Sequence, residues 1–448
     1  TIQNLFVKLI LNCRNLHYTD NVKAYLLCSF RNKLLDAFQS LRPMEVIEEC
    51  HEFFPMGEEI INNIISYDNN YDYDFLNYIY NNYGINTLEN INTSYKNNTY
   101  SYNVWHDLTG NSLKVLKDLS NNNLDNTKII DKKGDITLSF VGDISLADNF
   151  DIMPYYDSRN EGVYGILSKE VVDIMTSSDI MVANNEFTIS TRGTPLNKTY
   201  TFRADPKRLN IYKEMGVNLV SLANNHIYDY GIEAFNDTLK YLKEYDIPFV
   251  GAGHNISEAK KSFSYIVGGY KISFISSTRA EKNIITPGAT SDSPGVFRCY
   301  DNTLLKETIK EEKEKSDYVV LLIHWGKEDS HELEEVIKVT GKEYIDEGAD
   351  LIIGSHAHLL QGMEIYNNKL IAYNLGDFIF NRETKDTGIL SVTLNKKGNL
   401  SYKFIPCKQD NYKTSLLEGK EKDRVLNNMN SYSINVIFNN DGIIKTVN

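Results

Sequence analysis

Residues 135–150 read DITLSFVGDISLADNF. The mainly apolar run ITLSFV within this stretch is followed by a glycine and Asp143. Such a run predicts a buried β-strand followed by a loop, because β-branched and aromatic residues fill it and turn-forming residues follow it. Similar runs recur at 179–186, 218–226, 318–326 and 349–358, with helical periodicity between them. Strands that alternate with helices in this way predict an α/β fold, arranged as a layered sandwich.

Every one of these predicted strands ends in side chains that can bind a metal ion. In chain order they are Asp143, Glu186, Asn225 with His226, His324, and His356 with His358. Ligand sites of α/β sheets collect at the carboxyl ends of strands, so these side chains are expected to converge. Buried carboxylates need compensating charge, which a metal centre supplies. A lone histidine after a strand is more often structural, so the prediction depends on the whole set.

Seven blocks, in order along the chain, resemble the CapA or PgsA family of poly-γ-glutamate synthesis proteins. They cover about 135 to 380 and read SFVGDISLADNF, ANNEFTIS, VSLANNHIYDYG, FVGAGHN, LLIHWGKE, GADLIIGSHAHLLQGMEIY and LIAYNLGDFIF. That family is similar to the calcineurin-like metallophosphoesterases. The resemblance therefore implies a two-sheet α/β/β/α sandwich of that type, two bound metal ions, and a part in capsule or polymer metabolism.

The same resemblance implies a role for each residue of the set. Asp143 and His358 correspond to ligands of a first metal, and Glu186 to the carboxylate that bridges both ions. The ligands of the second metal correspond to Asn225, His324 and His356. Oxygen and imidazole donors without thiolates favour Mn, Fe or Zn in a reactive site over a structural zinc site.

His226 is left free to act near the substrate, where a group with a pKa near neutrality can donate a proton or stabilise charge. Asp229 is a candidate to orient His226, although the pattern slightly favours its capping the helix that follows. The sequence differs from the phosphoesterase and CapA patterns at two positions that would lie near the first metal. Phosphoesterases usually carry Asp-x-His on the first strand, whereas Ser145 stands here, and Asp377 stands where CapA proteins commonly have asparagine. Asp377 is interpreted as structural, with a carboxylate near the site as the alternative.

Four further polar residues are candidates for contact with the substrate. Arg203 and Arg279 could clamp an anion, because guanidinium matches phosphate or carboxylate with two hydrogen bonds, although surface roles fit equally. Asn224 is included with them, as is Glu328, which could instead orient His324. His254 and His331 lie outside the pattern.

The sequence also suggests three regions. Residues 1–133 are expected to be mainly helical, with predicted helices over 21–41 and 44–54 and Asn/Tyr-rich stretches after them. The polar stretch 120–135 is interpreted as a linker, 134–394 as the metallophosphoesterase-type domain, and 395–448 as a β-rich extension packing on it. A carbohydrate- or wall-binding role for the Asn/Tyr-rich part is a weaker alternative to tyrosines that fill a core.

A net charge of −13 argues against nucleic acid as a partner, and no apolar run is long enough to span a bilayer. The five cysteines lack paired spacing and are interpreted as buried thiols. Buried thiols favour a cytoplasmic localisation, and so does the absence of a secretion signal in this chain. Family resemblance favours the cell surface instead. The expected function is a metal-dependent hydrolase acting on a phosphoester or an anionic polymer such as poly-γ-glutamate. The alternative is a nonenzymatic metal-binding scaffold in a polymer synthesis or export complex.

Overall fold

The computed structural model describes residues 55–68, 71–281 and 285–447. The chain divides into two compact units, Thr1–Asn98 and Thr99–Asn448. The helices within the described ranges are all too short or too polar to cross a membrane.

The described part of the first unit is helical. It contains α4 (Pro55–Tyr67), α5 (Tyr73–Tyr83) and α6 (Ile85–Lys96). Asp72 caps α5 by accepting a hydrogen bond from the N–H of Phe75, and Gly84, with φ of 81°, lets the chain turn from α5 into α6. The buried side chains are mostly aliphatic, including Ile64, Leu76, Ile79, Leu88 and Ile91. The helical prediction is confirmed for these residues, while the helices expected over 21–41 and 44–54 lie outside the described residues.

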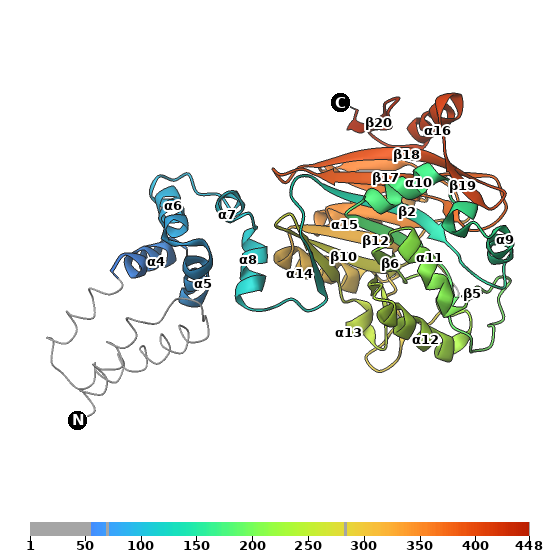
Figure 1. Ribbon diagram of the computed structural model, residues 1–448, viewed down its shortest axis with the longest axis horizontal. Helices are drawn as coiled ribbons and strands as arrows, with labels where there is room; N and C mark the ends of the chain where they lie inside the picture. The colour runs from blue at the N-terminus through green and yellow to red at the C-terminus, as the bar shows by residue number, and fades with distance from the viewer. Residues whose placement is uncertain (1–54, 69–70, 282–284, 448) are drawn as a thin grey trace. The chain divides into compact units, whose positions relative to one another are not determined.

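Two sheets form the centre of the second unit (Figure 1). One has the order β19-β18-β17-β2-β3-β6-β7, and β16 also pairs with β2. Its strands are β2 (Ile136–Ile144), β3 (Ile180–Asn185), β6 (Leu219–Ser221), β7 (Phe249–Val250), β16 (Asp377–Ile379), β17 (Lys385–Leu394), β18 (Leu400–Asp410) and β19 (Lys413–Leu416).

The other sheet has the order β1-β9-β10-β12-β13-β15-β14. Its strands are β1 (Thr127–Ile130), β9 (Phe263–Val267), β10 (Tyr270–Thr278), β12 (Tyr318–His324), β13 (Leu351–Ser355), β14 (Met363–Tyr366) and β15 (Lys369–Ala372). β2, β3, β6 and β7 run parallel in the first sheet, as β10, β12, β13 and β15 do in the second. Such strands are buried on both faces, which is why their sequences read as continuous apolar runs.

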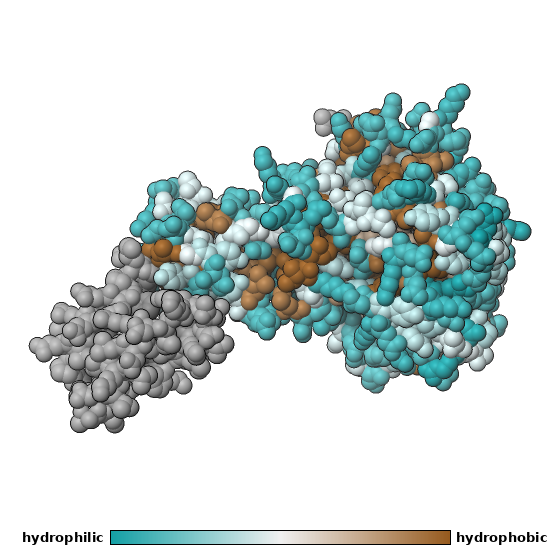
Figure 2. Space-filling view, viewed as in Figure 1, coloured by the Kyte–Doolittle hydropathy of each residue, from teal (hydrophilic) through white to brown (hydrophobic). Residues whose placement is uncertain are grey.

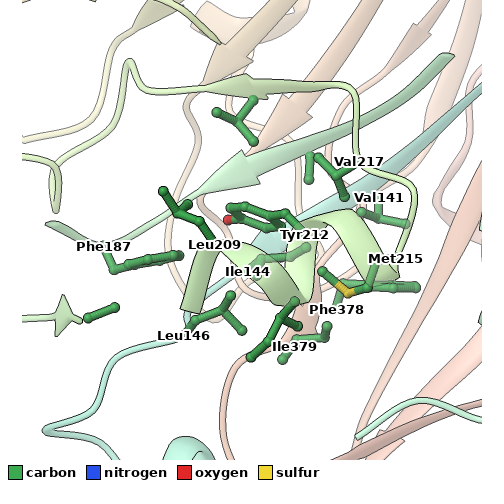
Figure 3. Close-up of a cluster of buried hydrophobic side chains, with 14 of the residues drawn as sticks. Val141, Ile144, Leu146, Phe187, Leu209, Tyr212, Met215, Val217, Phe378 and Ile379 are labelled. Carbon is green, nitrogen blue, oxygen red and sulfur yellow. The ribbon is translucent and has the colours of Figure 1, made fainter. Parts of the chain in front are cut away.

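Helices cover the outer face of each sheet. The β2 sheet packs against α9 (Ile152–Arg159), α10 (Lys169–Ser177), α11 (Leu209–Glu214) and α12 (Gly231–Glu244), and the β12 sheet against α14 (Thr303–Lys315) and α15 (Glu335–Asp346). The side chains between the β2 sheet and its helices form a hydrophobic core. Figure 3 shows part of it, where Val141 and Ile144 of β2 lie near Tyr212 of α11. A further core, with Phe140 and Phe274 at its centre, fills the space between the sheets. The predicted α/β/β/α sandwich is confirmed.

Short elements complete the second unit. They are α7 (Asn103–Thr109), α8 (Leu113–Ser120), α13 (Ile256–Ala259), α16 (Gly419–Tyr432), β4 (Thr188–Ile189), β5 (Arg203–Ala204), β8 (Ala252–Gly253), β11 (Gly295–Val296), β20 (Val436–Phe438), β21 (Ile444–Thr446) and the 3₁₀ turns Gly162–Gly165 and Pro206–Arg208. Most of the face seen in Figure 2 is hydrophilic, as expected for a unit whose cores lie between layers.

The compact units divide after Asn98, whereas the sequence suggested a boundary near Lys133. The difference arises because residues on the early side of Lys133 pair with the β12 sheet. β1, inside the expected linker, pairs in parallel with β9, and Ser112 at the start of α8 donates a 2.6 Å hydrogen bond to Asp317. After β17, the strands β18 and β19 extend the β2 sheet, so the residues from 395 onward include part of that sheet.

A candidate metal centre

Both sheets contribute residues to a cluster at the carboxyl ends of their parallel strands. β2 ends beside β3 with Asp143 opposite Asn184, and β12 ends beside β13 with His324 opposite Ser355. The loops after β3, β6 and β13 supply Glu186, Asn225 with His226, and His356 with His358. The structure therefore brings together the whole predicted set of metal ligands.

Asn184 connects the two acidic residues of this cluster. Its amide nitrogen donates to Asp143 Oδ1 at 2.8 Å and to Glu186 Oε2 at 3.0 Å, and both carboxylates are fully buried. Burial raises the pKa of Asp143, and it raises the pKa of Glu186 well above its ordinary value, with the Asp143 charge adding to the rise. Ionised carboxylates in this position call for a nearby cation.

Imidazoles and an amide form the other half of the cluster. His324 Nε2 lies 2.8 Å from Asn225 Oδ1, while its Nδ1 lies 2.8 Å from the Ser355 hydroxyl. The rings of His324 and His356 are 4.6 Å apart between centroids. Burial lowers the pKa of His356 to about 3 and that of His324 well below its ordinary value, so both rings are neutral at pH 7 and can act as ligands.

Asp377 joins the cluster from β16. Its Oδ1 lies 2.7 Å from His358 Nδ1, and its Oδ2 lies 2.9 Å from the ammonium of Lys385. His358 Nδ1 is also 3.6 Å from Asp143 Oδ2. Burial alone would lower the pKa of His358, but the carboxylates of Asp377, Glu186 and Asp143 together raise it well above its ordinary value. The sequence assigned Asp377 a structural role, and the structure places it against a predicted ligand.

Two buried atoms of the cluster have no hydrogen-bond partner, Glu186 Oε1 and His356 Nδ1. Polar atoms buried without a partner are rare in folded proteins because each costs about 1–3 kcal/mol. Two groups of donor atoms here are close enough to share an ion, one from Asp143, Glu186 and His324 and one from Asp143, His358 and Asp377. The donor set therefore fits divalent metal ions.

His226 stands beside the cluster and is held by Asp229. Its Nδ1 lies 2.7 Å from Asp229 Oδ2, which leaves Nε2 directed towards Glu186 Oε1 at 3.9 Å. Asp229 in turn accepts a hydrogen bond from the Phe202 N–H and pairs with Lys198 at 2.9 Å. Burial lowers the pKa of His226, so the ring is neutral at pH 7.

Aromatic rings line one side of the centre. Phe202 lies 4.5 Å from His226 and 5.4 Å from Phe380 between ring centroids, and Phe380 lies 4.9 Å from His358. Tyr200, whose residue surface is 60% exposed, lies 6.5 Å from Phe202. This row of rings was not predicted from the sequence.

The four predicted substrate contacts lie in different surroundings. Asn224 is buried, donates to Asn184 Oδ1 at 3.1 Å and accepts from the His226 N–H. The Arg203 guanidinium donates to the carbonyl of Arg192 and lies 4.2 Å from the centre of the Tyr230 ring. These contacts occupy both side chains with neighbouring protein groups.

Arg279 and Glu328 lie closer to the histidines. The N–H of Arg279 donates to the His324 carbonyl at 2.8 Å, and its side chain reaches the carbonyl of Tyr300. Glu328 Oε1 lies 3.8 Å from His356 Nε2, with 56% of its side chain exposed. Contact of these residues with a substrate remains a prediction.

Ser145, His254 and His331 were named from the sequence as departures from the ligand pattern or as residues outside it. Ser145 is buried and its hydroxyl has no partner. His254 is exposed, and His331 lies 2.7 Å from the Leu360 carbonyl and stacks on Tyr432. Sequence reasoning missed Asn184, although ANNE and ANNH repeat one motif and their first asparagines, Asn184 and Asn224, hydrogen-bond to each other.

A family model described as bacterial capsule synthesis protein PGA_cap matches residues 137–382. The chain belongs to this family. The resemblance to CapA proteins is thereby confirmed. All residues of this cluster of candidate ligands lie within the part of the chain that matches PGA_cap, whereas Lys385 lies just beyond it.

Named relatives of this PGA_cap chain match between 46% and 65% of its length. The PGA biosynthesis protein CapA of Bacillus subtilis is 30% identical over 284 residues, covering 60% of this chain and 71% of that protein. The capsule biosynthesis protein CapA of Bacillus anthracis is 28% identical over 302 residues, covering 65% and 72%. A probable polyglutamine synthesis accessory protein of Mycobacterium tuberculosis is 27% identical over 213 residues, covering 46% and 56%.

Proposed function

We propose that this chain is a metal-dependent hydrolase of capsule or poly-γ-glutamate metabolism, with a phosphoester or an anionic polymer as substrate. The names of the two Bacillus relatives support the metabolic setting. The observation that supports hydrolysis is the buried Glu186 Oε1 without a partner, beside neutral imidazoles and a second carboxylate.

Glu186 would bridge two ions, with Asp143 and His358 on one side and Asn225, His324 and His356 on the other. When bound, such ions supply an activated water at neutral pH and neutralise negative charge that develops on the substrate. The donor set fits Mn, Fe and Zn alike, because all three metals accept oxygen and imidazole ligands.

His226 would first accept a proton at its free Nε2, from the attacking water, and then deliver that proton to the leaving group. Asp229 fixes its Nδ1 at 2.7 Å, so the free Nε2 faces the carboxylate side of the centre. The low pKa of the buried ring keeps it from carrying a permanent charge. A neutral, oriented imidazole of this kind suits proton transfer.

The test uses full-length protein stripped with chelator and reloaded with Mn²⁺. Hydrolysis of a bis-aryl phosphodiester and of γ-linked glutamate chains is measured for wild type, Glu186→Gln, His226→Ala and the exposed control His254→Ala. The proposal predicts Mn²⁺-dependent hydrolysis of one substrate class, lost in the first two variants and kept in the control. Activity that survives in Glu186→Gln and His226→Ala would contradict it.

A nonenzymatic scaffold in a polymer synthesis complex is the second candidate. The observation that favours it is the buried Ser145, whose hydroxyl offers a poorer ligand than a histidine. The word "accessory" in the name of the Mycobacterium tuberculosis relative is compatible with it. This candidate predicts Mn²⁺ binding that raises the melting temperature, with hydrolysis of neither substrate class.

A further inference from the structure

We propose that Asp377 is a direct ligand of one of the two ions, and that Lys385, by pairing with its outer oxygen, limits how tightly that ion binds. The inference rests on the metal centre of the proposed function and adds a ligand to it. It assigns Asp377 to the same ion as Asp143 and His358.

The backbone holds Asp377 and Asp143 side by side. β16 runs parallel to β2 with these two residues in register, and the N–H of Asp143 donates to the Gly376 carbonyl at 3.0 Å. Both side chains are fully buried. This short strand, which pairs with β2 at Asp143 and Ile144, brings a second carboxylate to the end of β2.

The donor atoms of Asp143, His358 and Asp377 are close enough together to share an ion after small shifts. His358 Nδ1 lies 2.7 Å from Asp377 Oδ1 and 3.6 Å from Asp143 Oδ2. Ligands bonded to one cation at about 2.1 Å stand roughly 3 to 3.5 Å apart. The Glu186 Oε1 atom without a partner lies 3.8 Å from the other nitrogen of the same ring, so an unsatisfied acceptor adjoins the group.

Charge at the group also favours an ion. Asp143, Glu186 and Asp377 are all fully buried. Within the described ranges, Lys385 is the lysine or arginine that pairs with any of them, and it reaches Asp377 while also pairing with Glu383 at 3.0 Å. His358 contacts the other two carboxylates as well, at 3.6 Å from Asp143 and 3.8 Å from Glu186, and a divalent ion would add positive charge that one imidazole cannot supply to three carboxylates.

The competing interpretation is that Asp377 only orients His358 through a hydrogen bond, as carboxylates behind metal-bound histidines do. Asp377→Asn separates the two. The amide oxygen still accepts a hydrogen bond from His358, but it is a much weaker ligand than a carboxylate. If Asp377 only orients His358, Asp377→Asn should change the Mn²⁺ affinity little. If Asp377 is a ligand, the same variant should weaken Mn²⁺ binding strongly.

The experiment titrates Mn²⁺ into chelator-treated full-length protein by calorimetry. Wild type should bind two ions, and Asp377→Asn should weaken one of them at least 10-fold while the other keeps its affinity. The visible absorption of the Co²⁺-loaded variant should also change, because a ligand is lost. Glu364→Gln, which removes a buried carboxylate paired with Lys342, is the matched control and should behave as wild type.

Lys385→Met gives an independent test should Asp377→Asn fold poorly. Removing the competing ammonium should tighten one ion several-fold, and unchanged Mn²⁺ affinity would overturn the inference. Wild-type affinities and an unaltered Co²⁺ spectrum in Asp377→Asn would overturn it as well. A wild-type chain that binds no Mn²⁺ would instead contradict the proposed function, so the two failures are distinguishable.

Discussion

Asn184 holds the acidic half of the centre through hydrogen bonds to Asp143 and Glu186. Asn184→Ala should lower the free energy of unfolding of the metal-free protein by about 1–3 kcal/mol, because buried acceptors lose their donor. Urea denaturation measures the change. The exposed Asn210→Ala should stay within about 0.5 kcal/mol of wild type. Equal stabilities for the two variants would contradict the role given to Asn184.

In the proposed reaction, Asp229 would act through His226, whose Nδ1 it holds at 2.7 Å. In Asp229→Asn the amide can present a donor to Nδ1, so the ring no longer keeps its proton there. We expect kcat on the substrate that proves to be hydrolysed to fall about 10²- to 10⁴-fold, with little change in KM. Steady-state kinetics of Asp229→Asn and of the exposed control Asp173→Asn measure this. A change confined to KM would mean that Asp229 serves binding instead.

Single residues also show what the sequence could and could not predict. Each predicted ligand follows an apolar run, and strand ends of this kind converge in any parallel sheet. Asn184 was missed because an asparagine inside the run IMVANN reads as part of the strand. For Asp377 the sequence favoured a structural role over a carboxylate near the site, because the pairing of β16 with β2 depends on a long-range contact that no local pattern reports.

At the level of elements, the approach of β16 to β2 depends on Gly142. A Cβ atom at this position would lie 1.9 Å from the Gly376 carbonyl oxygen. Gly142→Ala should therefore push the two strands apart, separate Asp143 from Asp377 and weaken Mn²⁺ binding at least 10-fold. The measurement is the same calorimetric titration.

Gly165→Ala is the matched glycine control for that titration. An added methyl there meets nothing closer than 3.4 Å, so binding should be unchanged. Wild-type Mn²⁺ affinity in Gly142→Ala would show that the β2–β16 contact does not shape the site.

At the level of the whole molecule, the sandwich was predictable because helices and apolar strands alternate through most of the second unit. The start of the second unit was not predictable in the same way. β1 has the sequence TKII within a polar stretch, and it is a strand because it pairs with β9. The stretch 120–135 thus reads as a linker yet contributes the edge strand β1, and α8, which the sequence assigned to the helical region 1–133, belongs to the second unit.

The position of β1 and α8 predicts the result of truncation. A chain of residues 134–448 should melt several degrees below one of residues 99–448, because it loses β1 and leaves Lys271, which is 6% exposed, without the Asp118 carboxylate at 2.6 Å. Circular dichroism on heating measures both. Equal melting temperatures would favour the boundary near Lys133.

The proposed metal centre requires Glu186 to lie between two metal ions at the ends of β2, β3, β12 and β13. The most direct measurement is an anomalous difference map from crystals of the full chain grown with Mn²⁺. We expect two peaks, one beside Asp143 and His358 and one beside His324 and His356, with Glu186 touching both. A map without peaks at this cluster, from protein that is otherwise folded as described, would contradict it.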